Sequence, residues 1–157
     1  MTQQNRRPII ERILLTPARL AQLMERSKVR VTEARMDVLA CLVAASRPLT
    51  HHEIAALLPQ YDASTIFRGL TEFAASNIVW RIETGETDRF FEIADFRFDG
   101  ESAPRHPHFY CVKCGELRCL RDVSLEQSVS ILLGISDIKP TDLLVKGLCL
   151  CCRHDAP

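Results

Sequence analysis

The 157-residue chain lacks several features that would assign it to a functional class at once. It has no apolar run long enough to cross a bilayer, and the stretch from Ile9 to Leu15 is too short and too charged for a signal peptide. It also lacks net charge, because 20 Lys and Arg balance 20 Asp and Glu, so its composition does not indicate nucleic-acid binding. We therefore expect a cytoplasmic protein with no membrane partner.

The chain does have a large apolar fraction and many cysteines. Hydrophobic residues make up 46% of it, enough for the core of one domain or of two small ones. Its seven cysteines, in a reducing compartment, indicate metal binding or redox chemistry rather than disulfides. Residues 1–80 contain 10 Lys and Arg against 7 Asp and Glu, whereas residues 81–157 contain 10 against 13. This division fits a mildly basic module that faces DNA and a separate metal-rich module.

Helix-start signals divide the first half of the chain into four expected helices. Thr16, Thr32, Thr50 and Asp62 each stand where an N-cap is expected, and Thr50 with Glu53 forms a capping box. Apolar residues at helical spacing then predict the inward faces. These are Leu20, Leu23 and Met24; Met36, Leu39, Ala40 and Val43; Ile54, Leu57 and Leu58; and Ile66, Leu70, Phe73 and Ala74 in a helix over 63–75.

The third and fourth helices, joined by a tight turn, predict a helix-turn-helix whose second helix enters the major groove. Ser64, Thr65 and Arg68 lie on its polar face and have groups that contact phosphates or bases, with Phe67 at the rim. An ordinary solvated helix face is the alternative interpretation. Strands over 78–82 and 89–93 follow as a hairpin, which completes the order of a winged helix.

A linker over 94–105, which contains glycine and proline, is the expected domain boundary. It separates a winged-helix domain with an N-terminal extension, 1–93, from a smaller domain, 106–157. The smaller domain is expected to contain strands over 109–112 and 116–120, a helix over 123–133 with Val129, Leu132 and Leu133 on its apolar side, and a last strand over 138–146. The fold class is therefore α+β.

Two Cys-x-x-Cys pairs, Cys111 with Cys114 and Cys149 with Cys152, predict one tetrahedral zinc site. A two-residue gap lets both sulfurs of a pair reach one ion, and Gly115 permits the tight turn. Four thiolates close the coordination sphere, so this zinc would be structural. Free structural cysteines or a thiol redox pair are the alternatives, and Cys151 could replace Cys152 as a ligand. Cys41, in contrast, is expected to pack in a core.

His106, His108 and Cys119 predict a second metal site. Alternate residues of an extended segment point the same way, and pairing of the strands around the first cysteine pair would bring Cys119 near His108. Two imidazoles and a thiolate suit zinc better than iron or manganese. The candidates for the fourth ligand are Glu92, His51, His52 and Glu126. The alternative is that the histidines lie on the surface and Cys119 is a small core residue.

Taken together, these residues resemble the ferric uptake regulator family of bacterial metal-dependent repressors, from about Val29 to Cys152. The resemblance is carried by Val31-Thr32-Glu33-Ala34-Arg35, Ala63-Ser64-Thr65-Ile66-Phe67-Arg68-Gly69-Leu70, His106-Pro107-His108-Phe109-Tyr110-Cys111-Val112-Lys113-Cys114-Gly115 and Gly147-Leu148-Cys149. It implies a winged-helix DNA-binding domain followed by a small α/β dimerisation domain. It also implies a homodimer that binds double-stranded operator DNA when a metal site between the domains is filled.

Carried over by position, the resemblance implies two sets of functional residues. The DNA-facing candidates are Arg30, Arg35, Ser64, Thr65, Phe67 and Arg68, and the regulatory ligands are Glu92, His106, His108 and Cys119.

This chain also departs from the family's pattern. Cys119 replaces the usual carboxylate, and Phe67 stands where tyrosine is usual. The family's histidine ligand from the DNA-binding domain falls near Pro48, for which His51 and His52 are the candidate substitutes, and Thr141 stands where iron regulators often have histidine. The thiolate at the sensing site favours a zinc-responsive member.

The sequence therefore predicts a metal-dependent transcriptional repressor, not an enzyme, that controls metal-homeostasis genes in response to zinc. A structural zinc and a second, regulatory metal, also zinc, are its expected cofactors. The alternatives are an iron- or peroxide-responsive member of the same family and a thiol redox protein that uses its Cys-x-x-Cys pairs.

Overall fold

The computed structural model describes residues 16–45, 47–86, 89–94, 105–121, 124–134 and 137–154, and these fall into two compact units. The first unit contains the described residues up to Ala94, and the second contains those from Arg105 onward. Each combines helices with its own three-stranded sheet, so the α+β class is as predicted. Between Ala94 and Arg105, the predicted linker lies outside the described residues. No described helix is long and apolar enough to span a bilayer.

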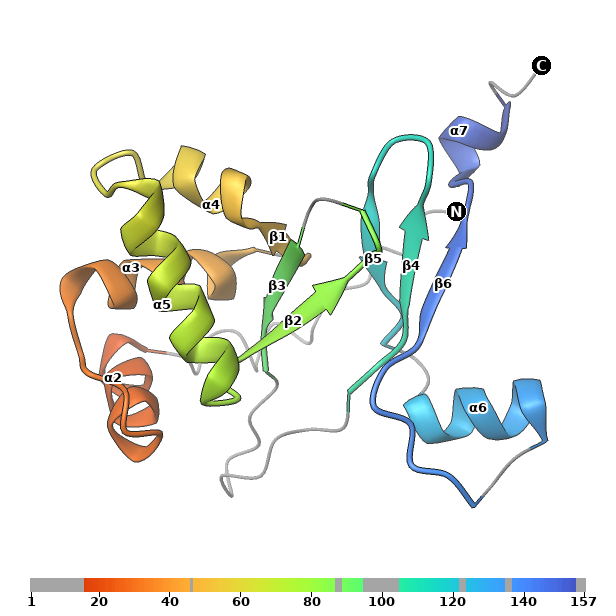
Figure 1. Cartoon of the computed structure of the whole chain (residues 1–157), viewed down its shortest axis with the longest axis horizontal. Helices are drawn as coiled ribbons and strands as arrows, with labels where there is room; N and C mark the ends of the chain where they lie inside the picture. The colour runs from red at the N-terminus through yellow and green to blue at the C-terminus, as the bar shows by residue number, and fades with distance from the viewer. Residues whose placement is uncertain are drawn as a thin grey trace. The chain divides into compact units, whose positions relative to one another are not determined.

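The described helices of the first unit begin at the caps that the sequence predicts (Figure 1). At each start a Thr or Asp side chain accepts a hydrogen bond from a backbone N–H of the first turn, which has no acceptor within the helix. The helices are α2 (Pro17–Arg26), α3 (Glu33–Ala44), α4 (His51–Leu57) and α5 (Ala63–Ala75).

The sheet of the first unit contains a strand that the sequence did not reveal. The predicted hairpin is formed by β2 (Val79–Glu83) and β3 (Arg89–Ile93), and β1 (Leu49–Thr50) pairs with the other edge of β3, so the order is β1-β3-β2. All pairs are antiparallel. A two-residue strand is too short to leave an alternating pattern, so the prediction missed it.

Two of the predicted inward faces in the first unit are partly wrong. In α3 the buried residues are Val38, Leu39 and Leu42, whereas Ala40 is exposed and Met36 and Val43 are half-buried. Apolar residues surround most of α3, so their spacing did not select a face. In α4 only Ile54 is buried, and Leu57 is 61% exposed. In the other two helices Leu23 and Ala74 are half-buried, and the remaining predicted core residues are buried.

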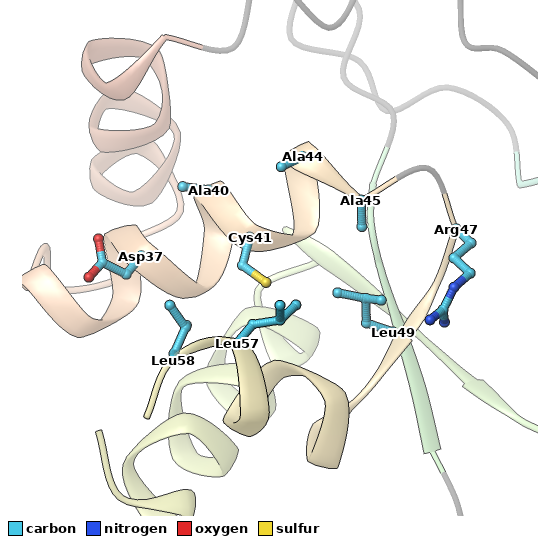
Figure 2. A pocket seen from close by; sticks show the side chains of 9 residues that line it. All are labelled: Asp37, Ala40, Cys41, Ala44, Ala45, Arg47, Leu49, Leu57 and Leu58. Atoms are coloured by element: carbon cyan, nitrogen blue, oxygen red, sulfur yellow. The ribbon is translucent and has the colours of Figure 1, made fainter. Parts of the chain in front are cut away.

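Leu57 borders a groove of about 700 Å³ in the first unit, between α3 and α4 (Figure 2). The lining is mostly apolar, with Asp37 and Arg47 toward its two ends. Cys41 also lines the groove and is half-buried rather than part of a sealed core. Burial raises the pKa of its thiol, so Cys41 is a neutral packing residue.

The second unit is built on a mixed sheet of order β5-β4-β6. The central strand β4 (His108–Cys111) is antiparallel to β5 (Leu117–Cys119) and parallel to β6 (Leu144–Gly147). The prediction started the last strand too early, at residue 138, because its apolar residues continue across Pro140. A short helix, α7 (Leu150–His154), follows β6 and was not predicted.

The remaining helix of the second unit, α6 (Leu125–Leu133), begins at the predicted cap, Ser124. It ends at Gly134, whose φ of +66° is a conformation that glycine adopts without strain. Val129 is buried as predicted, but Leu132 and Leu133 are 66% and 63% exposed. The buried side of α6 is instead formed by Leu125, Ser128 and Val129.

Candidate metal centres and nucleic-acid interface

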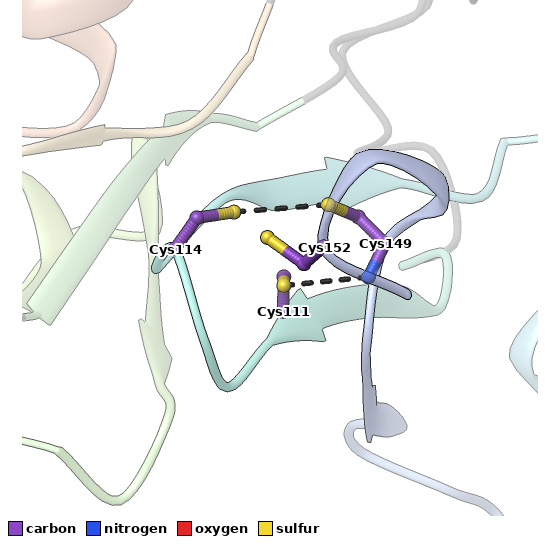
Figure 3. A group of neighbouring side chains, drawn as sticks. All are labelled: Cys111, Cys114, Cys149 and Cys152. Atoms are coloured by element: carbon purple, nitrogen blue, oxygen red, sulfur yellow. Dashed lines mark hydrogen bonds between the residues drawn. The ribbon is translucent and has the colours of Figure 1, made fainter. Parts of the chain in front are cut away.

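The sheet of the second unit brings the two Cys-x-x-Cys pairs together (Figure 3). Cys111 ends β4, and Cys149 follows the parallel strand β6, so both pairs leave the sheet at the same end. The sulfur atoms of Cys111, Cys114, Cys149 and Cys152 all lie within 4.8 Å of one another. Cys152 belongs to this group, whereas Cys151 is exposed on α7.

The local backbone fixes the four sulfurs. Gly115 adopts a φ of +73°, and its N–H donates to the carbonyl oxygen of Cys111 at 2.9 Å, which closes the first knuckle. The backbone N–H of Cys149 donates to Cys111 Sγ at 3.3 Å. This bond and another from the Cys114 backbone lower the pKa of Cys111 to about 6, whereas a side-chain hydrogen bond with Cys149 raises the pKa of Cys152 to about 12.

The spacing and charge of these sulfurs fit zinc. Cys114 Sγ and Cys149 Sγ lie 3.8 Å apart, close to the roughly 3.8 Å expected between sulfurs held at about 2.3 Å from a tetrahedral ion. Four thiolates at such distances repel one another strongly, which is why full deprotonation of the group requires a cation. The four sulfurs therefore have the number and spacing that a closed, four-coordinate metal site requires.

A second group of donors is formed by His106, His108 and Cys119 in the same unit. Cys119 is the register partner of His108 across the β4–β5 pair, so the expected strand pairing does bring them together. The imidazole rings of His106 and His108 have centroids 4.7 Å apart. All three side chains are buried, and one donor atom from each lies within 4.8 Å of the others.

The surroundings of His108 favour the neutral form of its imidazole. Burial, followed by the nearby His106, lowers the pKa of His108 to about 4, so the ring is neutral at pH 7 and offers a lone pair. The Nε2 atom of His106 and the Nδ1 atom of His108 are buried and form no hydrogen bond with the described residues. Two imidazoles and a sulfur are donors that suit zinc.

Arg121 is a participant in this group that the sequence did not reveal. Its Nη2 atom donates to Cys119 Sγ at 3.5 Å. A guanidinium beside a thiol stabilises the thiolate, which is the form that binds metal. The contact depends on how the chain turns after β5, so no spacing pattern could have predicted it.

The candidates for a fourth ligand differ in their surroundings. Glu92, on β3 of the first unit opposite Trp80, is only 4% exposed. The Nε2 atom of His51 lies 2.8 Å from the carbonyl oxygen of Ala63, and the His51 ring packs edge-on against Phe67. His51 is therefore engaged in contacts within the helix-turn-helix. His52 and Glu126 are exposed. A buried carboxylate is the most costly of the four to keep without a cation.

The candidate nucleic-acid interface centres on the start of α5. Asp62 caps the helix by accepting hydrogen bonds from the hydroxyls of Ser64 and Thr65 and from the backbone N–H of Thr65. These bonds hold the pKa of Asp62 well below its usual value, and the bond from Ser64 has the largest effect. Phe67 is 40% exposed, and the exposed Arg68 donates to Ser64 Oγ at 3.4 Å.

The two arginines that the resemblance adds to this interface are joined to each other. Arg30 is exposed in the loop before α3. Arg35, whose side chain is 21% exposed, donates through Nη1 to the carbonyl oxygen of Arg30 at 2.8 Å and forms an ion pair with Glu72 of α5. Arg35 is thus engaged in contacts within the first unit.

Comparison with known proteins places this arrangement in a family. A sequence model described as "Ferric uptake regulator family" matches residues 26–146. The "Ferric uptake regulation protein" of Legionella pneumophila is 28% identical over 143 residues, which are 85% of this chain and 98% of that protein.

Solved structures of ferric uptake regulators have the same fold as this chain. That of Vibrio cholerae matches with a TM-score of 0.65 and 22% identity, over 83% of this chain and 99% of that one. That of Helicobacter pylori matches with a TM-score of 0.67 and 21% identity, over 87% of this chain and 90% of that one. A zinc uptake regulator complexed with zinc and DNA matches with a TM-score of 0.56 and 18% identity, over 88% and 93%.

Proposed function

Because this chain belongs to the ferric uptake regulator family and is thus a metal-responsive regulator, we propose that it is a zinc-dependent repressor of metal-homeostasis genes. In this proposal a homodimer binds double-stranded operator DNA when the group of His106, His108 and Cys119 holds zinc. The observation that carries the proposal is the thiol of Cys119 beside two buried imidazoles. Sulfur and imidazole donors favour zinc over manganese or iron, which prefer more oxygen ligands.

A separate, structural zinc is proposed for Cys111, Cys114, Cys149 and Cys152. The 3.8 Å sulfur–sulfur distance and the closed set of four cysteines support this assignment. The ion would fasten the end of β4 to the start of α7 and so stabilise the second domain, residues 106–157. The first domain would then be residues 1–93, with the linker over 94–105.

The surface of the second unit supports dimer formation. Ile131, Leu132 and Leu133 at the end of α6 are 77%, 66% and 63% exposed. Contiguous exposed apolar side chains are unfavourable in water and mark interaction surfaces. We propose that the second copy of the chain covers them, which would also supply the two-fold symmetry that a palindromic operator requires.

The coupling from metal to DNA is proposed to use Glu92 as the fourth regulatory ligand. Glu92 belongs to the first unit, whereas the other three ligands belong to the second. A metal that takes donors from both would bind one arrangement of the domains more tightly, and that differential affinity is what shifts a conformational equilibrium. In the favoured arrangement, Ser64, Thr65, Phe67 and Arg68 of α5 would enter the major groove, with Arg30 and Arg35 near the backbone.

The test is a DNA-binding titration at buffered concentrations of free metal. The metal-loaded protein first selects its preferred duplex from a random pool, and fluorescence anisotropy then measures binding to that duplex with zinc, iron(II), manganese(II) or chelator. We expect binding with zinc at low free concentration and its loss with chelator. Equal binding with and without metal would disprove metal-dependent repression. Binding that responds to iron or manganese at lower free concentrations than zinc would disprove the choice of zinc.

A further inference from the structure

An ion pair fastens the candidate recognition helix, α5, to α3. Arg35 extends from the first turn of α3 to Glu72 of α5, and the side chains are 21% and 38% exposed. The helices are close here, because a Cβ built on Gly69 would lie 3.8 Å from Cγ of Arg35. A second donor of the same guanidinium bonds to the carbonyl oxygen of Arg30 at 2.8 Å. The fork of Arg35 is therefore held in one orientation from two sides.

Glu72 also belongs to the polar side of α5. It follows Ser64 and Arg68 at four-residue intervals, so the three side chains lie along one line of the helix. Arg68 donates to Ser64 within this line. Glu72 is the single acidic residue of α5. A carboxylate in this line would meet the phosphates of a duplex that receives the start of α5, which is an unfavourable contact unless the charge is neutralised.

Pairing changes the charge that this surface offers to DNA. Arg35 and Glu72 together are neutral, so Arg30 and Arg68 supply the unpaired positive charge of this surface in the proposed interface. A guanidinium held in one orientation reaches a phosphate only when the protein sits at one position along the duplex. A guanidinium without its carboxylate partner can instead turn toward phosphates at many positions. Contacts of the second kind add affinity for any sequence.

We propose that Glu72 is a specificity-determining residue: by orienting and neutralising Arg35, it lowers the affinity for unrelated DNA more than the affinity for the operator. This assignment rests on the proposed function, since it requires α5 to be the recognition helix. The role is one of positioning, because Glu72 acts on DNA through Arg35.

The test compares Glu72→Gln with the full-length wild-type protein, both loaded with zinc. Glutamine keeps the size of the side chain and removes its charge. Each protein is titrated with the duplex that the wild type selects from a random pool and with a scrambled duplex of the same composition, over a range of salt concentrations. Glu25→Gln, which removes the same charge from an exposed position on α2, is the matched control.

For Glu72→Gln we expect affinity for the scrambled duplex to rise several-fold and affinity for the selected duplex to change less. The slope of log affinity against log salt on the scrambled duplex should steepen by about 0.9, the value for one added phosphate contact. Glu25→Gln should reproduce neither change. A purely structural ion pair would instead weaken binding to both duplexes equally, with no change in slope.

The assignment is overturned if Glu72→Gln leaves both affinities unchanged, changes them equally or lowers both, while the wild type still discriminates between the duplexes. If the wild type shows no metal-dependent preference for any duplex, the proposed function itself fails, and the assignment fails with it. The wild-type titration therefore separates the two failures.

Discussion

Cys119 shows how one side chain determines the chemistry of a site. It lies across from His108 on the neighbouring strand, and Arg121 donates to its sulfur. A carboxylate at this position would give a harder donor set of nitrogen and oxygen, which accepts iron and manganese more readily. In the proposed regulatory site, the sulfur of Cys119 would therefore shift the preference of the group toward zinc.

At this scale we predict that Cys119→Ala weakens the zinc dependence of DNA binding but leaves the dimer intact. Removal of one ligand from the regulatory group should raise the free zinc concentration needed for half-maximal DNA binding by at least about 10- to 100-fold, the cost found even for indirect partners of metal ligands. Anisotropy with buffered zinc measures the shift, and sedimentation velocity measures the dimer.

Cys41→Ala is the matched control for Cys119→Ala. It removes a half-buried thiol that lines the groove of the first unit and has a raised pKa. It should leave the zinc midpoint unchanged. An unchanged midpoint in Cys119→Ala as well would show that this cysteine does not bind the effector metal.

At the scale of the element, a single residue, Thr50, belongs both to a strand and to the start of a helix. Thr50 ends β1, where it pairs with Phe90, and it also caps α4. Its side chain accepts from the backbone N–H of Glu53 at 3.2 Å, and the Glu53 carboxylate accepts from the backbone N–H of Thr50 at 2.7 Å. This box fixes the helix that precedes α5 in the helix-turn-helix.

We predict that Thr50→Ala lowers the free energy of unfolding of the first unit by about 1 kcal/mol, the usual cost of losing a threonine cap. Trp80 is the single tryptophan of the chain and lies buried on β2, so its fluorescence in urea reports on this unit. A midpoint equal to that of the wild type would show that the box contributes nothing to stability.

Thr71→Ala serves as the control for the capping substitution. Thr71 lies inside α5, is exposed, and donates to the carbonyl oxygen of Phe67 at 2.9 Å. Alanine is favourable at exposed positions inside a helix, so this change should shift the free energy of unfolding by less than about 0.5 kcal/mol.

At the scale of the whole molecule, each unit has its own means of stabilisation. The first unit buries large side chains such as Phe73 and Phe91 where helices meet its sheet. The second has a smaller core, in which buried Cys111, Cys149 and Cys152 form a cluster packed against Phe109. Small domains of this kind are commonly stabilised by a structural metal.

We therefore predict that Cys114→Ser abolishes the structural zinc, unfolds the second unit and abolishes the dimer, while the Trp80 transition of the first unit changes little. The reason is that metal-binding free energy serves as folding free energy in such domains. After the regulatory metal has been removed with chelator, the wild type should retain about one zinc per chain and Cys114→Ser none.

Cys151→Ser is the matched variant, because Cys151 and Cys114 are both exposed cysteines of the second unit, and only Cys114 belongs to the four-sulfur group. It should keep the zinc and the dimer. If Cys151→Ser loses the zinc and Cys114→Ser keeps it, Cys151 is the zinc ligand and Cys114 is not. Metal analysis and sedimentation velocity distinguish these outcomes.

The features that the sequence determined are those in which a few neighbouring residues act together. The caps at Thr32, Thr50 and Asp62 satisfy backbone donors three residues away, so helix starts could be predicted. The two cysteine pairs could be assigned to one group because each spacing already suits a single ion. The approach of Cys119 to His108 followed from one hairpin.

Only the tertiary structure decided the features that depend on residues distant in sequence. Arg35 meets Glu72 across 37 positions, and β1 exists only because β3 offers it an edge. The inward face of α3 and the exposed end of α6 were set by what each helix packs against, which spacing along one helix does not record. Local chemistry thus determined where these helices begin and which donor side chains come together, whereas packing decided which side chains are buried, paired or exposed.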